Sequence, residues 1–327
     1  MTAVPLFSQT TLFHMETYLG IDLGGTKLLI GEIDKYGNIL RYKKYASGYF
    51  NQRDAVAIIK ESLDDYIGTI GWFNSKPVSM GVGLIGRVDP NRGIWHQIDP
   101  TRTQPIELAR ELTEAYGIPC RIDNDVKSAT RAERVWGVGQ FSKNFIYINV
   151  GTGIAVGTVV NGRQIRGSHF NAGEAGHMRV GVNLGIRCVC GRYDCVENIA
   201  SGIGIDRCAR VLSGKYKTKL HIPSDKEGRV NVTKVYELCQ EGDPLCQVLV
   251  DNAAEAIANL IMNMVRITDP DTVVIGGGIV ADGFMYENII KRLHQPTMRF
   301  VSNGVVITKL NPEFCGLLGA GAVAMNM

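Results

Sequence analysis

Residues 18–34 read YLGIDLGGTKLLIGEID, and residues 146–162 read IYINVGTGIAVGTVVNG. Each stretch has an apolar strand pattern, a glycine turn and a second apolar strand pattern, which together predict a β-hairpin. The two stretches share their strand rhythm and their glycine placement, so the chain contains an approximate internal duplication. Two such hairpin units, each followed by helices, predict an α/β fold with two lobes and a ligand cleft between them.

Helix and strand patterns alternate around the two hairpins. Apolar residues on one helical face predict helices at 54–67 and 106–116, and short apolar runs predict strands at 78–83 and 119–122. The elements predicted further along are a helix at 126–135, a long helix at about 246–267, a strand at 272–275 and a helical stretch from Gly316.

The length of 327 residues, with 45% hydrophobic residues, fits two folded domains better than one. We expect an N-terminal extension at 1–17, a smaller lobe at 18–126 plus about 312–327, and a larger lobe at 127–311.

Charge and hydropathy exclude several classes of protein. The formal charge of +3 is spread over 35 basic and 32 acidic residues, so no nucleic-acid partner is expected. The sequence contains no apolar run of about twenty residues, which a membrane-spanning helix requires. The segment before Tyr18 lacks the charged region followed by an apolar region that is typical of a signal peptide. The sequence therefore predicts a cytoplasmic protein with no membrane partner.

Three glycine-rich segments each follow a predicted strand, where bare backbone N–H groups can approach phosphate oxygens. In the first segment, Thr26 and Lys27 can add donors and positive charge, and Asp22 can hold Mg²⁺ or its waters. Two duplicated turns would clasp one polyphosphate from both sides. The residues predicted to bind the nucleotide are Asp22, Gly24, Gly25, Thr26, Lys27, Gly151, Thr152, Gly153, Gly276, Gly277 and Gly278.

Other nucleotide motifs fit less well. Residues 81–86 match the dinucleotide fingerprint GxGxxG, but a turn follows them instead of the helix that a pyrophosphate requires. Residues 276–281 match a looser form and have no acidic residue about twenty positions further on. The P-loop pattern GxxxxGK[ST] does not occur in the sequence.

Three of the eight cysteines fall in one short turn, at Cys188, Cys190 and Cys195. Their thiolates, with the imidazole of His177, form a Cys₃His set of the kind that binds structural Zn²⁺. Four protein ligands leave no open position for a metal-bound water, so this zinc would be structural. The scattered cysteines, which we interpret as small core residues, are Cys120, Cys208, Cys239, Cys246 and Cys315.

The segment GHMRV…CVCGRYDCVE resembles the signature of the ROK family, whose name stands for repressors, open reading frames and kinases. The resemblance covers nearly everything after residue 17. The further matching segments are DLGGTK at 22–27, GLIGRVDP at 83–90, DNDVKSATRAE at 123–133, GTGIAVG at 151–157, GEAGH at 173–177 and the final glycine segments.

The resemblance implies an actin-like ATPase fold, related to ribonuclease H, and an ATP-dependent sugar kinase. It implies that Asp125 is the general base, a role in which a carboxylate accepts the proton of the attacking hydroxyl. The other interpretation of Asp125 is the N-cap of the helix at 126–135. The residues implied to contact the sugar are Gly86, Arg87, Asn124, Asp125, Glu174, His177 and Glu197.

Two positions depart from the family pattern. Lys127 replaces the usual asparagine and can alter the sugar pocket. Asp194 replaces the usual glycine before the third cysteine, and aspartate is one of the residues that tolerate a left-handed backbone.

The function implied is transfer of the γ-phosphoryl group of Mg-ATP to a hexose, with the 6-OH of glucose favoured. The nearest alternative is an N-acetylhexosamine kinase, because Gly86-Arg87 resembles the arrangement in N-acetylmannosamine kinases. An alternative of another class is a sugar-binding regulator of the same family, for which the seventeen residues before Tyr18 are too few to form a DNA-binding module. A non-catalytic actin-like scaffold ranks last. We expect a homodimer or a homotetramer.

Overall fold

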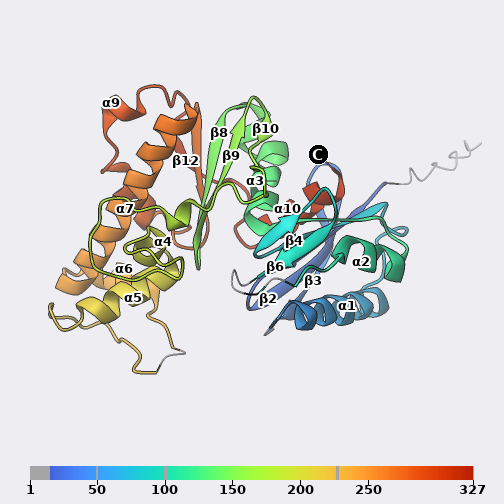
Figure 1. Ribbon diagram of the computed structural model, residues 1–327, viewed down its shortest axis with the longest axis horizontal. Helices are drawn as coiled ribbons and strands as arrows, with labels where there is room; N and C mark the ends of the chain where they lie inside the picture. The colour runs from blue at the N-terminus through green and yellow to red at the C-terminus, as the bar shows by residue number, and fades with distance from the viewer. Residues whose placement is uncertain (1–14, 49–50, 99–101, 103, 226–227, 327) are drawn as a thin grey trace, which may run out of the picture.

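The computed structural model describes residues 15–48, 51–98, 102, 104–225 and 228–326, so most of the predicted extension at 1–17 lies outside the described residues. The chain forms two lobes, and each lobe contains a five-stranded sheet (Figure 1). The strand orders are β3-β2-β1-β4-β7 and β10-β9-β8-β11-β12. In both sheets the first hairpin strand is antiparallel to the second and parallel to a later strand. The predicted duplication and the two-lobed α/β fold are confirmed.

The small lobe is built around the sheet that begins with the first hairpin. Its elements are β1 (Tyr18–Leu23), β2 (Lys27–Ile33), β3 (Ile39–Ala46), α1 (Gln52–Thr69), β4 (Ser79–Leu84), β5 (Arg87–Asp89), β6 (Ile94–Gln97), α2 (Leu108–Tyr116), β7 (Cys120–Asn124) and α10 (Cys315–Ala324). One hydrophobic core joins β1, β4 and β7 to α1 and α2. The helices and strands predicted for this part of the chain are confirmed to within a few residues.

The large lobe is built around the second hairpin. Its elements are β8 (Phe145–Val150), β9 (Ile154–Val160), β10 (Arg163–Gln164), η2 (Ala175–His177), α4 (Glu197–Ala200), α5 (Gly202–Leu212), α6 (Val232–Gln240), α7 (Pro244–Thr268), β11 (Thr272–Gly276), α8 (Phe284–Ile290), α9 (Gln295–Met298) and β12 (Val305–Ile307). Helix α7 is long and apolar enough to cross a membrane, but it is mostly buried and packs against α4, α5, α6 and α8. Burial of this kind is typical of a core helix.

Helix α10 packs very closely against β1 and β4, and glycines make this approach possible. A Cβ on Gly81 would lie 2.0 Å from the carbonyl oxygen of Ala320, and a Cβ on Gly20 would lie 2.8 Å from that of Leu317. Gly81 therefore serves helix packing, and the segment after it runs into β5 instead of a helix. Both observations agree with our rejection of the dinucleotide fingerprint at 81–86.

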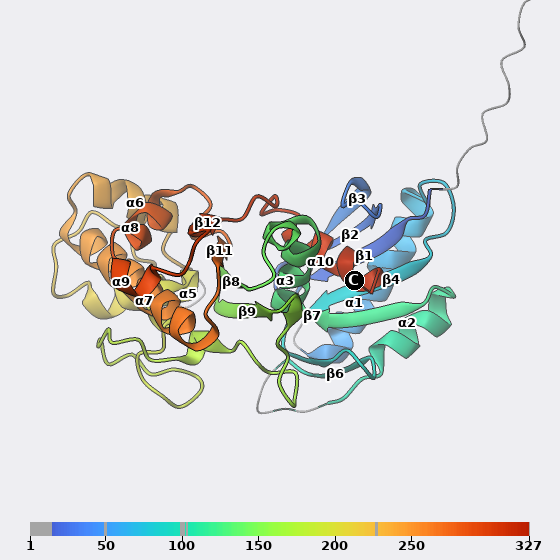
Figure 2. The ribbon, with the colours of Figure 1, turned by 90° about the horizontal axis from the view of Figure 1, so that it is seen from above.

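Helix α3 (Asp125–Trp136), followed by the short turn η1 (Val138–Gln140), lies between the two sheets (Figure 2). It packs against α10 of the small lobe and against β9 of the large lobe. The predicted division of the chain at residues 126 and 312 stays a prediction.

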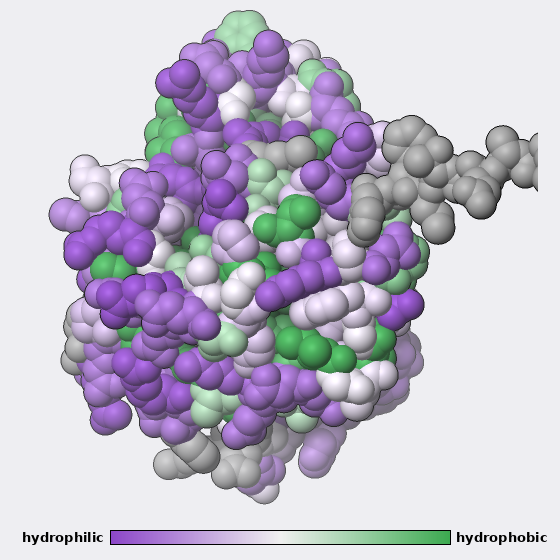
Figure 3. Space-filling view, turned by 90° about the vertical axis from the view of Figure 1, so that its right-hand side faces the viewer, coloured by the Kyte–Doolittle hydropathy of each residue, from purple (hydrophilic) through white to green (hydrophobic). Residues whose placement is uncertain are grey.

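The face of the molecule drawn in Figure 3 mixes hydrophilic residues with smaller hydrophobic areas. Such mixing is the usual surface of a folded domain, because the polar residues are too few to cover it completely.

Candidate functional site

The first glycine turn joins β1 to β2. Gly24 N donates a hydrogen bond of 2.9 Å to Lys27 O, and Ser47 Oγ donates one of 2.8 Å to Gly24 O. These bonds fix the shape of the turn. A Cβ built on Gly25 would meet nothing within 4 Å, so the turn is open on that side.

Asp22 is the last polar residue of β1 before this turn. A Cβ on Gly316 would lie 2.2 Å from its Oδ2 atom, so α10 can begin beside this carboxylate only because residue 316 is a glycine. Burial raises the pKa of Asp22 to about 6, and the positive charge of Lys27 opposes that rise. Binding of Mg²⁺ would favour the ionised form of such a carboxylate.

The second glycine turn joins β8 to β9. Gly151 N donates to Gly153 O at 3.0 Å, and Gly202 N, at the start of α5, donates to Gly151 O at 2.9 Å. The duplication therefore holds for the strands and the glycines, whereas the hydrogen bonds that fix the two turns differ.

The third glycine segment follows β11, which runs parallel to β8. Because the carboxyl ends of parallel neighbours meet at one edge of a sheet, residues after β11 lie beside the second turn. A cavity of about 370 Å³ opens there. Its lining residues are Gly151, Thr152, Gly202, Arg229, Val230, Val232, Gly278 and Ile279.

The three glycines predicted after β11 have different environments. Gly278 lines the cavity, whereas a Cβ on Gly276 would lie 2.7 Å from the hydroxyl of Tyr147. Gly277 has a φ of 97°, and a Cβ there would lie 2.3 Å from Val150 O. Packing and backbone conformation thus require glycine at 276 and 277, and Gly278 is the one that faces the cavity.

Several residues that line this cavity belong to no motif found in the sequence. The lining residues that the sequence analysis did not single out are Gly202, Arg229, Val230, Val232 and Ile279. Of these residues, only Gly202 could have been found from the sequence. It follows Ser201, a serine of the kind that caps a helix, and Ser201 is the N-cap of α5.

Asn124 and Asp125 stand where β7 ends and α3 begins. The side chain of Asn124 accepts hydrogen bonds from Val126 N and Lys127 N, so Asn124 is the N-cap. The alternative that made Asp125 the N-cap is therefore wrong, because α3 begins at Asp125, one residue earlier than predicted, and Asn124 takes the cap position. Asn124 Nδ2 also donates to Gly86 O at 3.1 Å, which ties the helix start to the turn before β5.

Asp125 is the first residue of α3, and its carboxylate accepts a 2.9 Å hydrogen bond from Val126 N. Burial raises the pKa of Asp125 to about 7, and the negative charges of Asp22 and Glu174 add to that rise. A carboxylate that titrates near neutral pH suits a general base.

Lys127 lies one turn into α3 and is buried. Its ammonium group donates to the carbonyl oxygen of Ala172, two residues before Glu174. Burial lowers the pKa of Lys127, and the charges of Glu174 and Asp123 oppose that effect. Lys127, which departs from the family pattern, therefore links the loop that carries Glu174 to the helix that carries Asp125.

The four predicted metal ligands come together at one point, although His177 lies on η2 and the cysteines lie on the turn before α4. Their ligand atoms all lie within 4.8 Å of one another. His177 Nδ1 is 3.4 Å from Cys188 Sγ, and Cys190 Sγ is 3.6 Å from Cys195 Sγ.

The two shorter spacings are close to those around one tetrahedral metal ion. Zn–S bonds of about 2.3 Å at tetrahedral angles put two sulfurs about 3.8 Å apart, and a Zn–N bond brings nitrogen and sulfur slightly closer. Both observed distances lie within a few tenths of an ångström of these values. The thiol and imidazole donors are also those that Zn²⁺ prefers.

Asp194 adopts the left-handed backbone conformation, with a φ of 56°, as predicted for the residue that replaces the usual glycine. Its carboxylate accepts hydrogen bonds from Leu184 N at 3.1 Å and Ile186 N at 2.9 Å. Aspartate thus offsets the cost of this backbone conformation by holding the preceding loop in place.

Two glutamates connect the metal ligands to the rest of the site. Glu174 Oε2 lies 4.0 Å from His177 Nε2, the ring nitrogen that faces away from the cysteines. Glu197, two residues after Cys195, accepts a 2.9 Å hydrogen bond from Ile154 N beside the second glycine turn. The cluster of His177 and the three cysteines is therefore adjacent to the carboxylate of Glu174 and to the second glycine turn.

Gly86 and Arg87 lie between β4 and the Asn124 side chain. Gly86 has a φ of 85°, and a Cβ there would lie 2.1 Å from Gln97 O, so only glycine fits. Arg87 begins β5 and has its Nε atom buried without a hydrogen-bond partner among the described residues.

Comparisons with known proteins agree with this arrangement. The profile of the ROK family matches residues 18–326. A glucokinase of Halalkalibacterium halodurans is 29% identical, and the match covers 85% of this chain and 84% of that protein. An N-acetyl-D-glucosamine kinase of Escherichia fergusonii is 30% identical, with 80% and 84% covered.

A solved structure of a glucokinase from Streptomyces griseus, in complex with glucose and AMPPNP, superposes with a TM-score of 0.73. It is 25% identical, and the match covers 95% of this chain and all of that one. The DNA-binding regulator NagC of Escherichia coli is 24% identical over 98% of this chain and 77% of that protein. The relatives therefore include two kinds of sugar kinase and a transcriptional regulator.

Proposed function

The chain belongs to the ROK family, and we propose that it is an ATP-dependent kinase that transfers the γ-phosphoryl group of Mg-ATP to a hexose. The favoured acceptor is the 6-OH of glucose. The nucleotide would lie against the glycine turns, and the sugar would lie beside Asp125.

One observation carries this proposal. Asp125 stands at the start of α3, close enough to Asp22 of β1 and to Glu174 of the loop before His177 that both carboxylates raise its pKa. A carboxylate base that is close both to groups able to bind phosphate and to groups able to hold a hydroxyl is suited to phosphoryl transfer.

In the proposed reaction, the sugar hydroxyl oxygen forms a bond to the γ-phosphorus while the bond from that phosphorus to the β–γ bridging oxygen breaks. ADP leaves, and the hydroxyl proton moves to the carboxylate of Asp125. Mg²⁺, when bound near Asp22, neutralises charge on the phosphates. Asn124, Glu174, His177 and Glu197 would orient the sugar.

A structural Zn²⁺ held by His177 and the three cysteines would fix the loop that carries Glu174. With Nδ1 on the metal, Nε2 of His177 stays on the side of Glu174 and can contact a sugar hydroxyl. The zinc would then act on the substrate only through the side chains that it positions.

The nearest alternative is an N-acetylhexosamine kinase. It is favoured by Gly86-Arg87 beside Asn124 and by the 30% identity to an N-acetyl-D-glucosamine kinase. A regulator without kinase activity is the alternative of another class, favoured by the match to NagC. We further propose that the protein acts in the cytoplasm and forms a homodimer or homotetramer.

A coupled ADP-release assay across glucose, mannose, glucosamine, N-acetylglucosamine and N-acetylmannosamine tests the proposal. We expect sugar-dependent ADP release with the highest kcat/KM for glucose. A highest value for an N-acetyl sugar would establish the first alternative, and the absence of ADP release with every sugar would favour the regulator.

The two glycine turns are expected to bind phosphate, so Gly25→Val and Gly151→Val should each weaken ATP binding while leaving sugar binding largely intact. A Cβ at Gly25 meets nothing within 4 Å, and the nearest atom to one at Gly151 is 3.6 Å away, so both variants should fold. A valine side chain would occupy the space that phosphate oxygens need. Titration calorimetry with ATP and with glucose measures the two affinities separately.

Gly68→Val is the matched control, because Gly68 lies on α1 away from both turns, a Cβ there also meets nothing within 4 Å, and its φ is outside the left-handed region. ATP affinity that is unchanged in both turn variants would move the nucleotide away from these turns.

A further inference from the structure

A small cavity lined by arginines lies outside the site described above. It has a volume of about 90 Å³ and opens at the edge of the small lobe, where β7, α3, α10 and the segment after β10 meet. We call it the arginine pocket, and the residues that define it are Asn91, Arg121, Arg131, Arg166 and Asn326.

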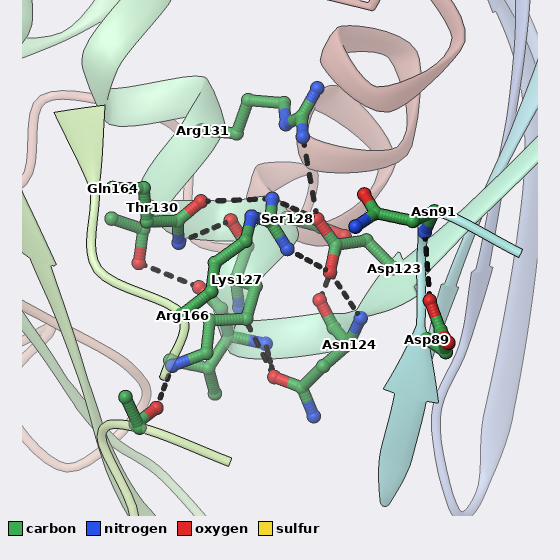
Figure 4. Close-up of polar contacts among 12 residues, drawn as sticks. Asp89, Asn91, Asp123, Asn124, Lys127, Ser128, Thr130, Arg131, Gln164 and Arg166 are labelled. Atoms are coloured by element: carbon green, nitrogen blue, oxygen red, sulfur yellow. Dashed lines mark hydrogen bonds and ion pairs between the residues drawn. The ribbon is translucent and has the colours of Figure 1, made fainter. Parts of the chain in front are cut away.

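The three arginines come from different elements. Arg121 belongs to β7, Arg131 to α3 and Arg166 to the segment after β10. Figure 4 shows Arg131 and Arg166 approaching the carboxylate of Asp123 from different directions, with Asn91 across from them. Arg121 and Asp123 point to the same face of β7, because they are two residues apart on one strand.

Asp123 is the carboxylate that neutralises part of this charge. Arg166 donates two hydrogen bonds to it, of 2.9 and 2.7 Å, and Arg131 Nη2 lies 3.6 Å from its Oδ2. Arg121 donates to Ala324 O at 3.1 Å and forms no ion pair within the described part of the chain.

Asp89 is the other carboxylate near the pocket, and its Oδ1 accepts hydrogen bonds from Asn91 N and Arg92 N. Among the described residues, Asp123 is the carboxylate in contact with the arginines that line the pocket, so three guanidinium groups share one such partner and positive charge is in excess there. The pKa of Arg131 is lowered to about 10, mainly by burial; Asp123 opposes this change and the neighbouring arginines contribute to it. An anion in the pocket would relieve this repulsion.

Size and chemistry restrict the anion. A cavity needs about 10–15 Å³ to admit one water, so about 90 Å³ has room for a few waters or for one small oxyanion. Guanidinium groups bind phosphate with paired hydrogen bonds, and the amides of Asn91 and Asn326 can add neutral donors.

We propose that the arginine pocket binds a small tetrahedral oxyanion of the phosphate class, either inorganic phosphate or the phosphoryl group of a sugar phosphate. The pocket is separate from the glycine turns, and this proposal does not depend on kinase activity.

Titration calorimetry with potassium phosphate tests the proposal, with the full chain at constant ionic strength and with AMPPNP, Mg²⁺ and glucose present to occupy the cleft. We expect binding by the wild type and at least tenfold weaker binding by Arg121→Gln, because a hydrogen-bonded charge is lost. Arg121→Lys, which keeps the charge and loses the paired geometry, should lie between them.

Arg299→Gln is the matched control, because Arg299 also donates to a backbone carbonyl and lies in the large lobe, far along the chain from the pocket. It should bind phosphate as the wild type does. Equal phosphate affinity in the wild type and Arg121→Gln, or no binding by the wild type at millimolar phosphate, would overturn the proposal. If Arg121→Gln fails to fold, the phosphate affinity of Arg121→Lys is compared with that of the wild type. Weaker binding by Arg121→Lys would support the proposal, and equal binding would overturn it.

A second titration with glucose 6-phosphate distinguishes the two sources of the oxyanion. Tighter binding than inorganic phosphate, with the same dependence on Arg121, would identify a sugar phosphate. Tighter binding of inorganic phosphate would identify the free ion.

Discussion

Asp125→Asn is expected to lower kcat by about a hundredfold or more, because asparagine keeps the size of the side chain but cannot accept a proton. Sugar affinity should change little, since an amide still bonds a hydroxyl. Steady-state kinetics and sugar titration of the same preparation separate the two effects. Near-normal turnover in this variant would remove Asp125 from the mechanism, and Asp123 or Glu174 would become the next residue to test.

The pH profile provides an independent check on the same carboxylate. The pKa of Asp125 is raised to about 7, and a base acts only when it is ionised. The activity of the wild type should therefore rise with pH through about 7 and level off above it. The residual activity of Asp125→Asn should lack this rise.

The raised pKa also has a consequence for stability. The folded state binds this proton more tightly than the unfolded state, so the contribution of Asp125 to stability is lost as pH rises from about 4 through 7. At pH 8, Asp125→Asn should therefore be at least as stable as the wild type. Asn124→Ala provides the comparison, because loss of the N-cap should cost about 1 kcal/mol of stability.

Cys190→Ser is expected to abolish binding of one zinc per chain and to destabilise the large lobe. Metal binding contributes on the order of 10 kcal/mol to the folding of small zinc modules, and loss of several kcal/mol here would lower the Tm by roughly 10 °C or more. Sugar affinity should fall as well, because His177 and Glu174 lie on the loop that the metal fixes. Elemental analysis, thermal unfolding and glucose titration measure these effects.

Cys190 is suited to this test because it is the exposed member of the set, so the serine itself disturbs little packing. Cys239→Ser is the control, since Cys239 lies on α6 outside the cluster. Zinc content and Tm that equal those of the wild type in Cys190→Ser would show that the ligand set is wrong.

The sequence predicted the features that depend on local patterns. The two hairpins, the long helix α7 and the position of Asp194 all follow from apolar spacing or from the conformational range of one residue type. The cluster of His177 with Cys188, Cys190 and Cys195 was predictable because the three cysteines lie within eight residues of one another.

Features that depend on tertiary packing were not predictable. Gly81 and Gly276 look like glycines of a phosphate-binding loop, but a helix and a tyrosine press against them. The N-cap is Asn124 instead of Asp125, because α3 follows β7 directly and the Asn124 side chain accepts hydrogen bonds from Val126 N and Lys127 N. The arginine pocket brings together residues from five separate places in the chain, and their spacing in the sequence forms no motif.

Phosphorus NMR of the protein with Mg-ATP and glucose tests the central claim most directly, because it observes the transferred group itself. We predict that the γ-phosphate signal of ATP declines only when glucose is present, and that an equal phosphomonoester signal appears with ADP. Loss of ATP to inorganic phosphate alone, or ATP signals that stay unchanged with glucose and with every other sugar of the panel, would contradict the assignment of this chain as a sugar kinase.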